Sequence, residues 1–192
     1  NPALPPFRDL DGLPYYDWDL KGHFILFDTL VPMTRERMRL LLEQYPLYVP
    51  SIYFLTSRGC PNKCTYCNNS RYISLFGKNI IRSYGVRRSM DEVRDTVEAL
   101  DLAHFVVFAD DDFFVRSKKA LREFCDIYRK EVNLPFAVAV SPKTYSLEKL
   151  KILLEAPMKV IQVGVQSGSQ RVLDEVFDRK IDLEKTMDIL NE

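Results

Sequence analysis

Three of the four cysteines of this 192-residue chain lie within eight residues, in the run CPNKCTYC from Cys60 to Cys67. Their spacing is C-x3-C-x2-C, and the run directly follows the apolar segment 52–55. Three thiolates on one short loop can bind three irons of a 4Fe–4S cluster, which usually takes four cysteine ligands. The missing fourth ligand would leave one iron open to a small molecule, as a catalytic zinc site keeps an open position.

Other uses of these thiols fit the pattern less well. A disulfide framework is not favoured, because the three neighbouring cysteines are odd in number and no secretory signal is visible. A structural zinc site would need a fourth Cys or His at finger-like spacing, and His23, His104 and Cys125 are all distant in sequence. The motif therefore favours a cluster, with zinc binding or a reactive thiol as the alternative.

The composition excludes several classes of function. Lys+Arg and Asp+Glu each number 27, so the balance gives no support for a surface that binds nucleic acid or an acidic membrane. No apolar run approaches the roughly 20 residues that a membrane-spanning helix needs. The few cysteines, most of them in one ligand loop, indicate a reducing compartment, and we expect a cytoplasmic protein.

The first 50 residues differ in character from the rest. Five of the eleven prolines fall within residues 1–32, and proline fixes the backbone and removes a donor. This segment is expected to be extended, lying on a surface or joining domains. Thr34 is expected to cap an amphipathic helix over residues 35–45. We therefore divide the chain into a proline-rich linker and helix, residues 1–50, and a core domain, residues 51–192.

Residues 51–192 alternate between apolar strands and amphipathic helices. Strands are expected at residues 52–56, 104–109, 136–140 and 160–165. Helices are expected to open at Ser89, Ser117, Ser146 and Ser169, with a last one over 183–190. Ser89 and Glu92 form the pattern of a capping box, and residues 68–78 are expected to be a loop with a helical turn. The fold class is therefore α/β, with parallel β/α units and right-handed crossovers.

Polar residues follow the end of each expected strand. The cysteine loop follows the first, residues 110–112 the second, Ser141 the third, and Gln166 with Ser167 the fourth. Because the carboxyl ends of strands in a β/α barrel meet at one mouth, these side chains are expected to surround one site. The aspartates of 110–112 could instead solvate a loop, cap a helix or bind a divalent metal ion.

The cysteine spacing, with the aromatic Tyr66 before the third cysteine, resembles the cluster loop of the radical S-adenosylmethionine (SAM) superfamily. The resemblance implies that Cys60, Cys64 and Cys67 bind a 4Fe–4S cluster whose open iron chelates SAM. An electron would then cleave SAM to methionine and a 5′-deoxyadenosyl radical, which abstracts hydrogen from a small-molecule substrate. It also implies an electron donor such as flavodoxin or ferredoxin.

The same resemblance implies a set of SAM contacts. Residues 110–112 stand where the family commonly has a Gly-Gly-Glu-like turn that meets the methionine ammonium, but here aspartates replace it. The segment 164–173, followed by Arg179, resembles the family's fourth strand-to-helix connection, which implies ribose and methionine-carboxylate contacts. Asp112 is expected to be a cap or exposed. The residues implied to contact SAM are Tyr66, Asp110, Asp111, Gln166, Ser167 and Arg179.

Two further segments resemble the cobalamin-dependent branch of this superfamily. They are the linker-like residues 8–20 and the pattern Phe-x-Asp-Asp-x-Phe at 108–113. The resemblance implies a partial radical SAM barrel with about four of the usual six β/α units, from a cobalamin-dependent methyltransferase-like enzyme. Cobalamin would bind through a domain not present in this chain. The alternatives are a methylthiotransferase-like radical SAM enzyme, or a non-catalytic binding module stabilised by zinc or a cluster.

Three arginines, Arg82, Arg87 and Arg88, lie between the cysteine loop and the next expected helix. They could reach an anionic substrate, but a solvated basic stretch is the favoured interpretation. The sequence does not identify the substrate.

Overall fold

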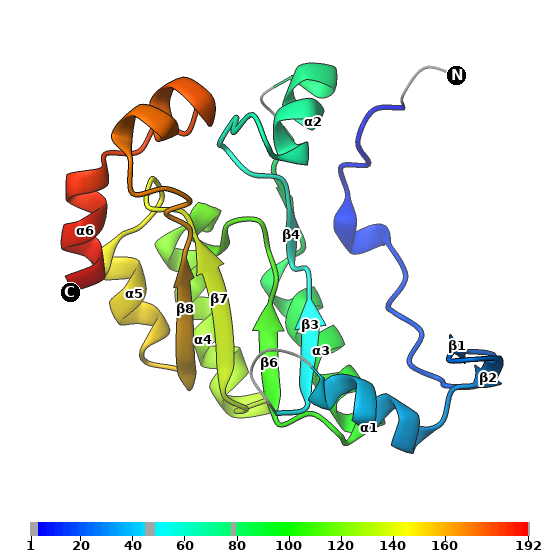
Figure 1. Cartoon of the computed structure of the whole chain (residues 1–192). Coiled ribbons are helices and arrows are strands. Elements are labelled where there is room, and N and C mark those ends of the chain that lie inside the picture. The colour runs from blue at the N-terminus through cyan, green and yellow to red at the C-terminus, as the bar shows by residue number, and fades with distance from the viewer. Residues whose placement is uncertain (1–3, 45–48, 78–79, 192) are drawn as a thin grey trace.

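The structure is a computed structural model that describes residues 4–44, 49–77 and 80–191. At its centre is a four-stranded parallel sheet with the order β3-β6-β7-β8 (Figure 1). The strands are β3 (Ser51–Phe54), β6 (Phe105–Phe108), β7 (Phe136–Val140) and β8 (Met158–Val163). Each expected strand is thus confirmed, and successive strands are neighbours, as β/α repeats require. Within the described residues the sheet stays open, with β3 and β8 at its edges.

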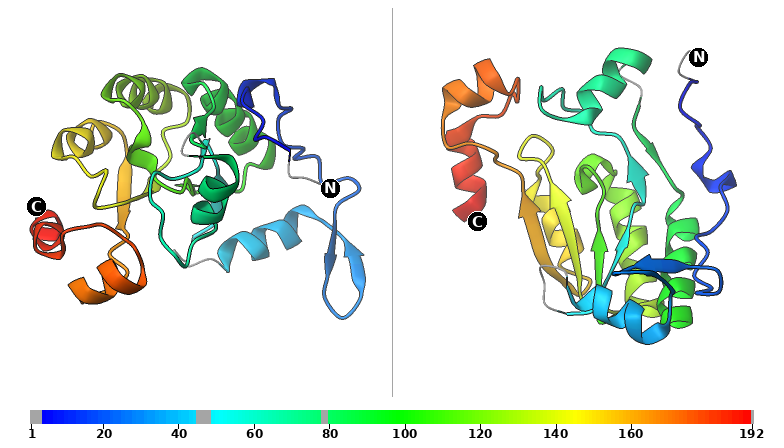
Figure 2. Two further views of the ribbon diagram at one scale, coloured as in Figure 1. Left: turned by 90° about the horizontal axis from the view of Figure 1, so that it is seen from above. Right: turned by 45° about the vertical axis from the view of Figure 1, so that its right-hand side comes forward.

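Three helices cover one face of this sheet (Figure 2). They are α3 (Val86–Leu100), α4 (Lys118–Glu131) and α5 (Leu147–Leu153). Fully buried apolar side chains fill the space between sheet and helices, and Phe108 lies at their centre. Its ring centroid is 5.1 Å from that of Phe124 and 5.7 Å from that of Phe136. Such edge-on aromatic contacts add to the stabilisation from burial alone.

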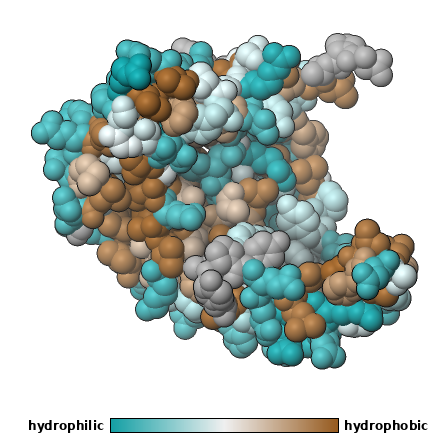
Figure 3. Space-filling model, viewed as in Figure 1, coloured by the Kyte–Doolittle hydropathy of each residue, from teal (hydrophilic) through white to brown (hydrophobic). Residues whose placement is uncertain are grey.

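The opposite face of the sheet is left open by these helices. Side chains alternate along a strand, so Ile52 and Phe54 point into the core while Tyr53 is 37% exposed. Figure 3 shows hydrophobic side chains gathered on this side of the molecule, over β8 and on the hairpin β1–β2. That hairpin, formed by β1 (Phe24–Leu26) and β2 (Leu30–Pro32), is not predicted by the sequence.

Serine and threonine caps are confirmed at two helices and wrong at a third. Thr34 caps α1 (Arg35–Glu43), since its hydroxyl accepts the Arg37 N–H at 3.3 Å; the expected end at residue 45 lies outside the described residues. Ser117 caps α4 in the same way. The capping box at Ser89 is wrong, because α3 already begins at Val86.

Two other helices differ from expectation. Residues 68–76 form the complete helix α2 (Asn68–Phe76) rather than a loop with one turn. The cause is amphipathic spacing, since the buried side chains of Asn69 and Ile73 lie four residues apart on one face. After β8 the helix expected at Ser169 is largely a π-helix (Val172–Val176), and α6 (Leu183–Asn191) follows it. None of the helices among the described residues is long and apolar enough to cross a membrane.

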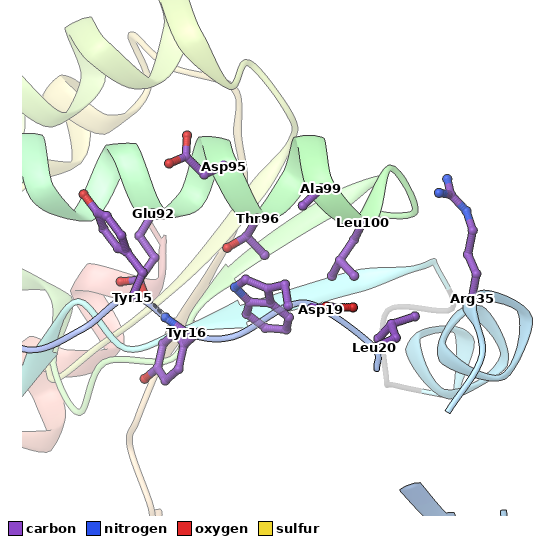
Figure 4. Close-up of a pocket in the computed structure, with 11 residues that line it drawn as sticks. Tyr15, Tyr16, Asp19, Leu20, Arg35, Glu92, Asp95, Thr96, Ala99 and Leu100 are labelled. Atoms are coloured by element: carbon purple, nitrogen blue, oxygen red, sulfur yellow. Dashed lines mark hydrogen bonds between the residues drawn. The ribbon is translucent and has the colours of Figure 1, made fainter. Parts of the chain in front are cut away.

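From residue 4 to the hairpin, the N-terminal segment runs extended along the outside of α3 and contains only a short 3-10 helix (Leu10–Gly12). The Tyr16 N–H donates to the Glu92 carboxylate at 2.8 Å, which is why Glu92 does not serve a capping box (Figure 4). Trp18 packs its ring against Phe54 at 6.5 Å. A cavity of about 600 Å³ remains between this segment and α3, and it shares no lining residue with the cysteine loop.

Candidate active site

The carboxyl ends of the sheet strands border a cavity of about 620 Å³. Ala139 on β7 and Gln162 on β8 form its floor, on the face of the sheet that the helices leave open. This is the mouth where the sequence places the site. The predicted residues that line it are Cys60, Cys64, Cys67, Tyr66, Asp111, Gln166 and Arg179, and Ser141 after β7 joins them.

Each of the three thiols in this cavity accepts a side-chain N–H. The donor–acceptor pairs are Asn62 Nδ2 to Cys60 Sγ at 3.4 Å, Arg179 Nη1 to Cys64 Sγ at 3.2 Å, and Asn69 Nδ2 to Cys67 Sγ at 3.7 Å. Hydrogen bonds to sulfur favour the charged thiolate and are among the factors that set the potential of an iron–sulfur cluster. The donor set therefore fits a group held by three thiolates.

Asn62 and Asn69 are not among the residues that the sequence predicts for the site. Both are buried, at 7% and 6% exposure, and Asn62 also donates to the Ser141 hydroxyl at 3.1 Å. A signal for them is present in the sequence, since an asparagine stands two residues after Cys60 and again after Cys67. In both cases the amide group donates back to the sulfur two residues earlier.

The cysteines lie in different electrostatic surroundings. Burial raises the pKa of the Cys60 thiol, and the carboxylates of Asp112 and Asp111 add to this effect, while hydrogen bonds from Asn62 oppose it. Cys125, expected to be a core residue, is fully buried, and burial raises its pKa to about 12. Among the described residues, no three His, Cys, Asp or Glu side chains are grouped as the shell of a single metal ion.

Arg179 joins the cysteine loop to the end of β8. It is 7% exposed, and its Nη2 donates to the Gly164 carbonyl at 2.6 Å while Nη1 lies 3.4 Å from the Tyr66 hydroxyl. Its Nε is buried and has no hydrogen-bond partner among the described residues. A buried N–H without a partner is costly, so this guanidinium still has bonding capacity for a ligand in the cavity.

The cysteine loop is also tied to the π-helix. The Thr65 N–H donates to the Phe177 carbonyl at 3.0 Å, and the Thr65 hydroxyl donates to the Val176 carbonyl at 2.7 Å. The rings of Tyr66 and Phe177 meet edge to face at 4.8 Å. Short π-helices occur frequently at functional sites, and this one fixes the loop from the β8 side.

The three consecutive aspartates have three different positions. Asp110 is buried and does not line the cavity; its carboxylate accepts the Thr56 hydroxyl at 2.8 Å and the Ser57 N–H, and pairs with Arg116 at 3.0 Å. Asp111 lines the cavity and accepts the Gly59 N–H at 2.9 Å. The SAM contacts implied for both residues stay predictions, and Asp111 is the better placed of the two.

Asp112 is a cap, as expected, but it is not exposed. Its carboxylate accepts the Phe114 N–H at 3.1 Å at the start of the 3-10 helix Phe113–Val115, and also the Thr144 hydroxyl. The residue is fully buried, and this burial raises the pKa of its carboxyl group. The alternative of an exposed Asp112 is therefore wrong.

Gln166 and Ser167 follow β8 at the edge of the cavity. Gln166 has a φ of 75°, an unusual value for a residue with a side chain, and it lines the cavity. Such strained positions cluster at ligand sites. Ser167 is not a lining residue, and its hydroxyl accepts the Ser169 N–H at 3.1 Å. Its contact with the SAM ribose stays a prediction.

Gly59→Ala is expected to destabilise the start of the cysteine loop. Gly59 has a φ of +90°, and a Cβ there would lie 2.8 Å from the Ile80 carbonyl oxygen. The strained backbone and the clash together are expected to cost about 2–4 kcal/mol of unfolding free energy. Urea unfolding measures this cost. Gly77→Ala is the matched control, because its φ is +79° but nothing lies within 4 Å, and equal costs would contradict the steric account.

An open parallel α/β sheet with a three-cysteine loop at the carboxyl end of its first strand defines the class of this protein. The chain belongs to the radical SAM superfamily, and the family model matches residues 54–192. This confirms the family that the cysteine spacing indicates.

Two curated relatives are named as methyltransferases. "Uncharacterized methyltransferase PH0819" of Pyrococcus horikoshii is 26% identical over 180 residues, which cover 91% of this chain and 33% of that protein. "Cytidylyl-2-hydroxyethylphosphonate methyltransferase" of Streptomyces wedmorensis is 27% identical over 195 residues, covering 99% and 33%. The chain thus spans about a third of the length of the curated relatives it matches.

Solved structures share the fold. The radical SAM methyltransferase TsrM from Kitasatospora setae, with cobalamin and a [4Fe-4S] cluster bound, matches with a TM-score of 0.60 at 18% identity, over 81% of this chain and 29% of that chain. The cobalamin-dependent enzyme OxsB, with aqua-cobalamin and SAM bound, matches with a TM-score of 0.58 at 20% identity, over 73% and 22%. These similarities confirm the α/β fold of the partial radical SAM barrel.

Proposed function

We propose that this chain is the partial catalytic core of a radical SAM enzyme, with Cys60, Cys64 and Cys67 binding a 4Fe–4S cluster and the adjoining cavity binding SAM. One observation carries the proposal: three thiols line the same cavity, and each accepts a side-chain N–H. A merely structural thiol loop would not need a donor for every sulfur beside a cavity of about 620 Å³. The family membership supports the same function.

The cluster, when bound, supplies the electron that cleaves SAM to methionine and a 5′-deoxyadenosyl radical. The polar groups around the cavity would hold SAM for that step. Arg179 offers a buried, unpartnered Nε to the methionine carboxylate, and the Asp111 carboxylate can accept hydrogen bonds from the ammonium group. Gln166 would face the ribose, and Tyr66 would lie beside the adenine.

The parent enzyme is proposed to be a cobalamin-dependent methyltransferase that acts on a small molecule. Support comes from two relatives named as methyltransferases and from two structural neighbours that are described with cobalamin bound. Cobalamin would bind through a domain outside this chain. We further propose an electron donor such as flavodoxin or ferredoxin and a cytoplasmic location.

Electron paramagnetic resonance tests the proposal directly. The protein is reconstituted with iron and sulfide under anaerobic conditions, reduced, and measured with and without SAM. A reduced 4Fe–4S signal that changes shape on addition of SAM is expected, because SAM would contact the open iron. A cluster signal that does not change on addition of SAM would contradict the catalytic proposal. Stoichiometric zinc in place of iron would indicate a non-catalytic binding module stabilised by zinc.

A further inference from the structure

Two arginines face each other beside the candidate site without a negative partner. They lie on the two-stranded antiparallel sheet of β4 (Ser57–Arg58) and β5 (Arg82–Ser83), where Arg58 is the direct register partner of Arg82. Directly opposed residues project from the same face of an antiparallel pair, and like charges at such positions are destabilising. Among the described residues, neither Arg58 nor Arg82 forms an ion pair with a carboxylate. The partners of Arg58 are the phenol groups of Tyr84 and Tyr16, which are neutral near pH 7.

The other two arginines of the basic stretch are neutralised. Arg87 pairs with Asp91 and Glu131, and Arg88 pairs with Glu92 at 3.0 Å. Their carboxylate partners belong to α3 and α4, so these two arginines form ion pairs within and between the helices. The interpretation of a solvated basic stretch therefore suits Arg87, but it does not account for Arg82.

The guanidinium of Arg82 is oriented by neutral groups. Its Nε donates to the Ile80 carbonyl at 3.2 Å and its Nη1 to the Phe7 carbonyl at 2.9 Å. These bonds hold the group in place but do not neutralise its charge. Burial lowers the pKa of Arg82, and the positive charges of Arg58 and Arg8 lower it further, so the surroundings of this guanidinium are positive. The pKa of Arg58 is instead raised, because hydrogen bonds with Tyr84 and Tyr16 outweigh its burial. Positive surroundings favour an anion.

A second cavity, of about 380 Å³, lies between this arginine pair and the cysteine site. Arg58, Arg82, Leu55 and Tyr72 line it, and Asp111 and Asn69 line both this cavity and the cysteine cavity. The two cavities therefore adjoin. The carboxylate of Asp111 already accepts the Gly59 N–H at 2.9 Å on this side.

We propose that Arg58 and Arg82 bind a doubly charged oxyanion of the substrate, a phosphate or phosphonate group, whose organic part extends past Leu55 and Tyr72 toward the cysteine cavity. Two guanidinium forks match the geometry and the charge of such a group, and its binding removes the repulsion between them. The assignment of this anion to the substrate rests on the proposed function, because it is the cysteine cavity toward which the ligand points.

The test uses inorganic phosphate as the probe, with acetate at equal ionic strength as the reference anion. Isothermal titration calorimetry and thermal unfolding are applied to the wild type, Arg58→Gln, Arg82→Gln and the double variant. Saturable binding of phosphate and a higher Tm are expected in the wild type, with affinity reduced at least about tenfold in each single variant, since a charge-assisted pair is lost. Arg122→Gln, an exposed change of equal charge on α4, is the matched control and should bind phosphate as the wild type does.

The unliganded proteins give a second readout. Without phosphate, Arg58→Gln is expected to unfold at a temperature close to that of the wild type, because it loses the cross-strand repulsion together with the hydrogen bonds of Arg58 to Tyr84 and Tyr16. An equal phosphate effect in the wild type and the double variant would overturn the proposal, as would an acetate effect as large as that of phosphate.

The experiment separates this inference from the proposed function. Arg58→Gln is expected to assemble the cluster and to keep the change in its spectrum on addition of SAM. If the wild type binds phosphate but its cluster signal does not change on addition of SAM, the anion site is supported and the proposed radical SAM function is contradicted. If SAM changes the signal and phosphate does not bind, the anion site alone is overturned.

Discussion

Cys64→Ser is expected to abolish assembly of an iron–sulfur cluster on this chain. The change removes the middle of the three thiolates, and a serine hydroxyl is a poor replacement because it stays protonated near neutral pH. The Cys64 sulfur also accepts the Arg179 N–H at 3.2 Å, so the variant loses a charged hydrogen bond next to the cavity. Iron content after anaerobic reconstitution should fall from about four per chain to near zero.

Cys125→Ala is the matched control for this prediction, because Cys125 is the one cysteine outside the loop. Its sulfur lies in the core and donates to the Ile152 carbonyl at 3.3 Å. The variant should therefore lose about 1–2 kcal/mol of unfolding free energy and keep its full iron content. Cluster assembly in Cys64→Ser equal to that of the wild type would refute the ligand assignment, and so would loss of iron in Cys125→Ala alone.

The strands of the central sheet could be predicted from the sequence because their signal is local. Residues 136–140 form a continuous apolar run, and β7 covers those five residues. The other three strands lie within two residues of the expected bounds at each end. Strands of parallel sheets are typically continuous apolar runs, while the polar residues at their ends have no place in a core. The change from apolar to polar residues at the strand ends also predicts where the cysteine loop begins and at which edge of the sheet the site lies.

The elements that could not be predicted depend on distant partners. Ser89 and Glu92 have the spacing of a capping box, but Glu92 instead accepts the Tyr16 N–H from a segment 76 residues away and pairs with Arg88. The Ser89 hydroxyl donates to the Gly85 carbonyl at 3.1 Å. A pattern of four residues cannot reveal that its carboxylate is engaged by another part of the chain, so the sequence places the start of this helix too late.

The candidate site shows the same division. The three cysteines are recognisable from spacing alone, whereas the different positions of Asp110 and Asp111 are decided by the segment 56–59, which contains β4 and leads into the cysteine loop. Thr56 and Ser57 engage Asp110, and Gly59 engages Asp111. Identical neighbouring side chains in a sequence thus acquire separate roles through contacts about 50 residues away. The sequence predicts that the acidic turn faces the mouth, and the fold determines which carboxylate lies in the cavity.

Asp110→Asn is expected to be among the most destabilising single changes in this domain, and Asp111→Asn among the mildest. The Asp110 side chain is 0% exposed and its partner Arg116 is 8% exposed, so the variant leaves a buried guanidinium without its counter-charge. Burial already lowers the pKa of Arg116, and the Asp110 carboxylate opposes that effect. Breaking one side of a buried pair costs about 3–5 kcal/mol, which urea unfolding would detect.

In contrast to the effects of these two variants on stability, only Asp111→Asn is expected to affect the binding of SAM in the cavity. Asp111 is exposed and accepts one backbone N–H, so Asp111→Asn should cost less than about 1 kcal/mol. If its carboxylate meets the methionine ammonium, this variant should need more SAM to change the spectrum of the reduced cluster. Asp110→Asn, measured at a temperature where it stays folded, should need no more SAM than the wild type. The reverse result would move the ammonium contact to Asp110 and make its pairing with Arg116 part of the binding site, because a carboxylate shared between a buried guanidinium and a ligand must serve both.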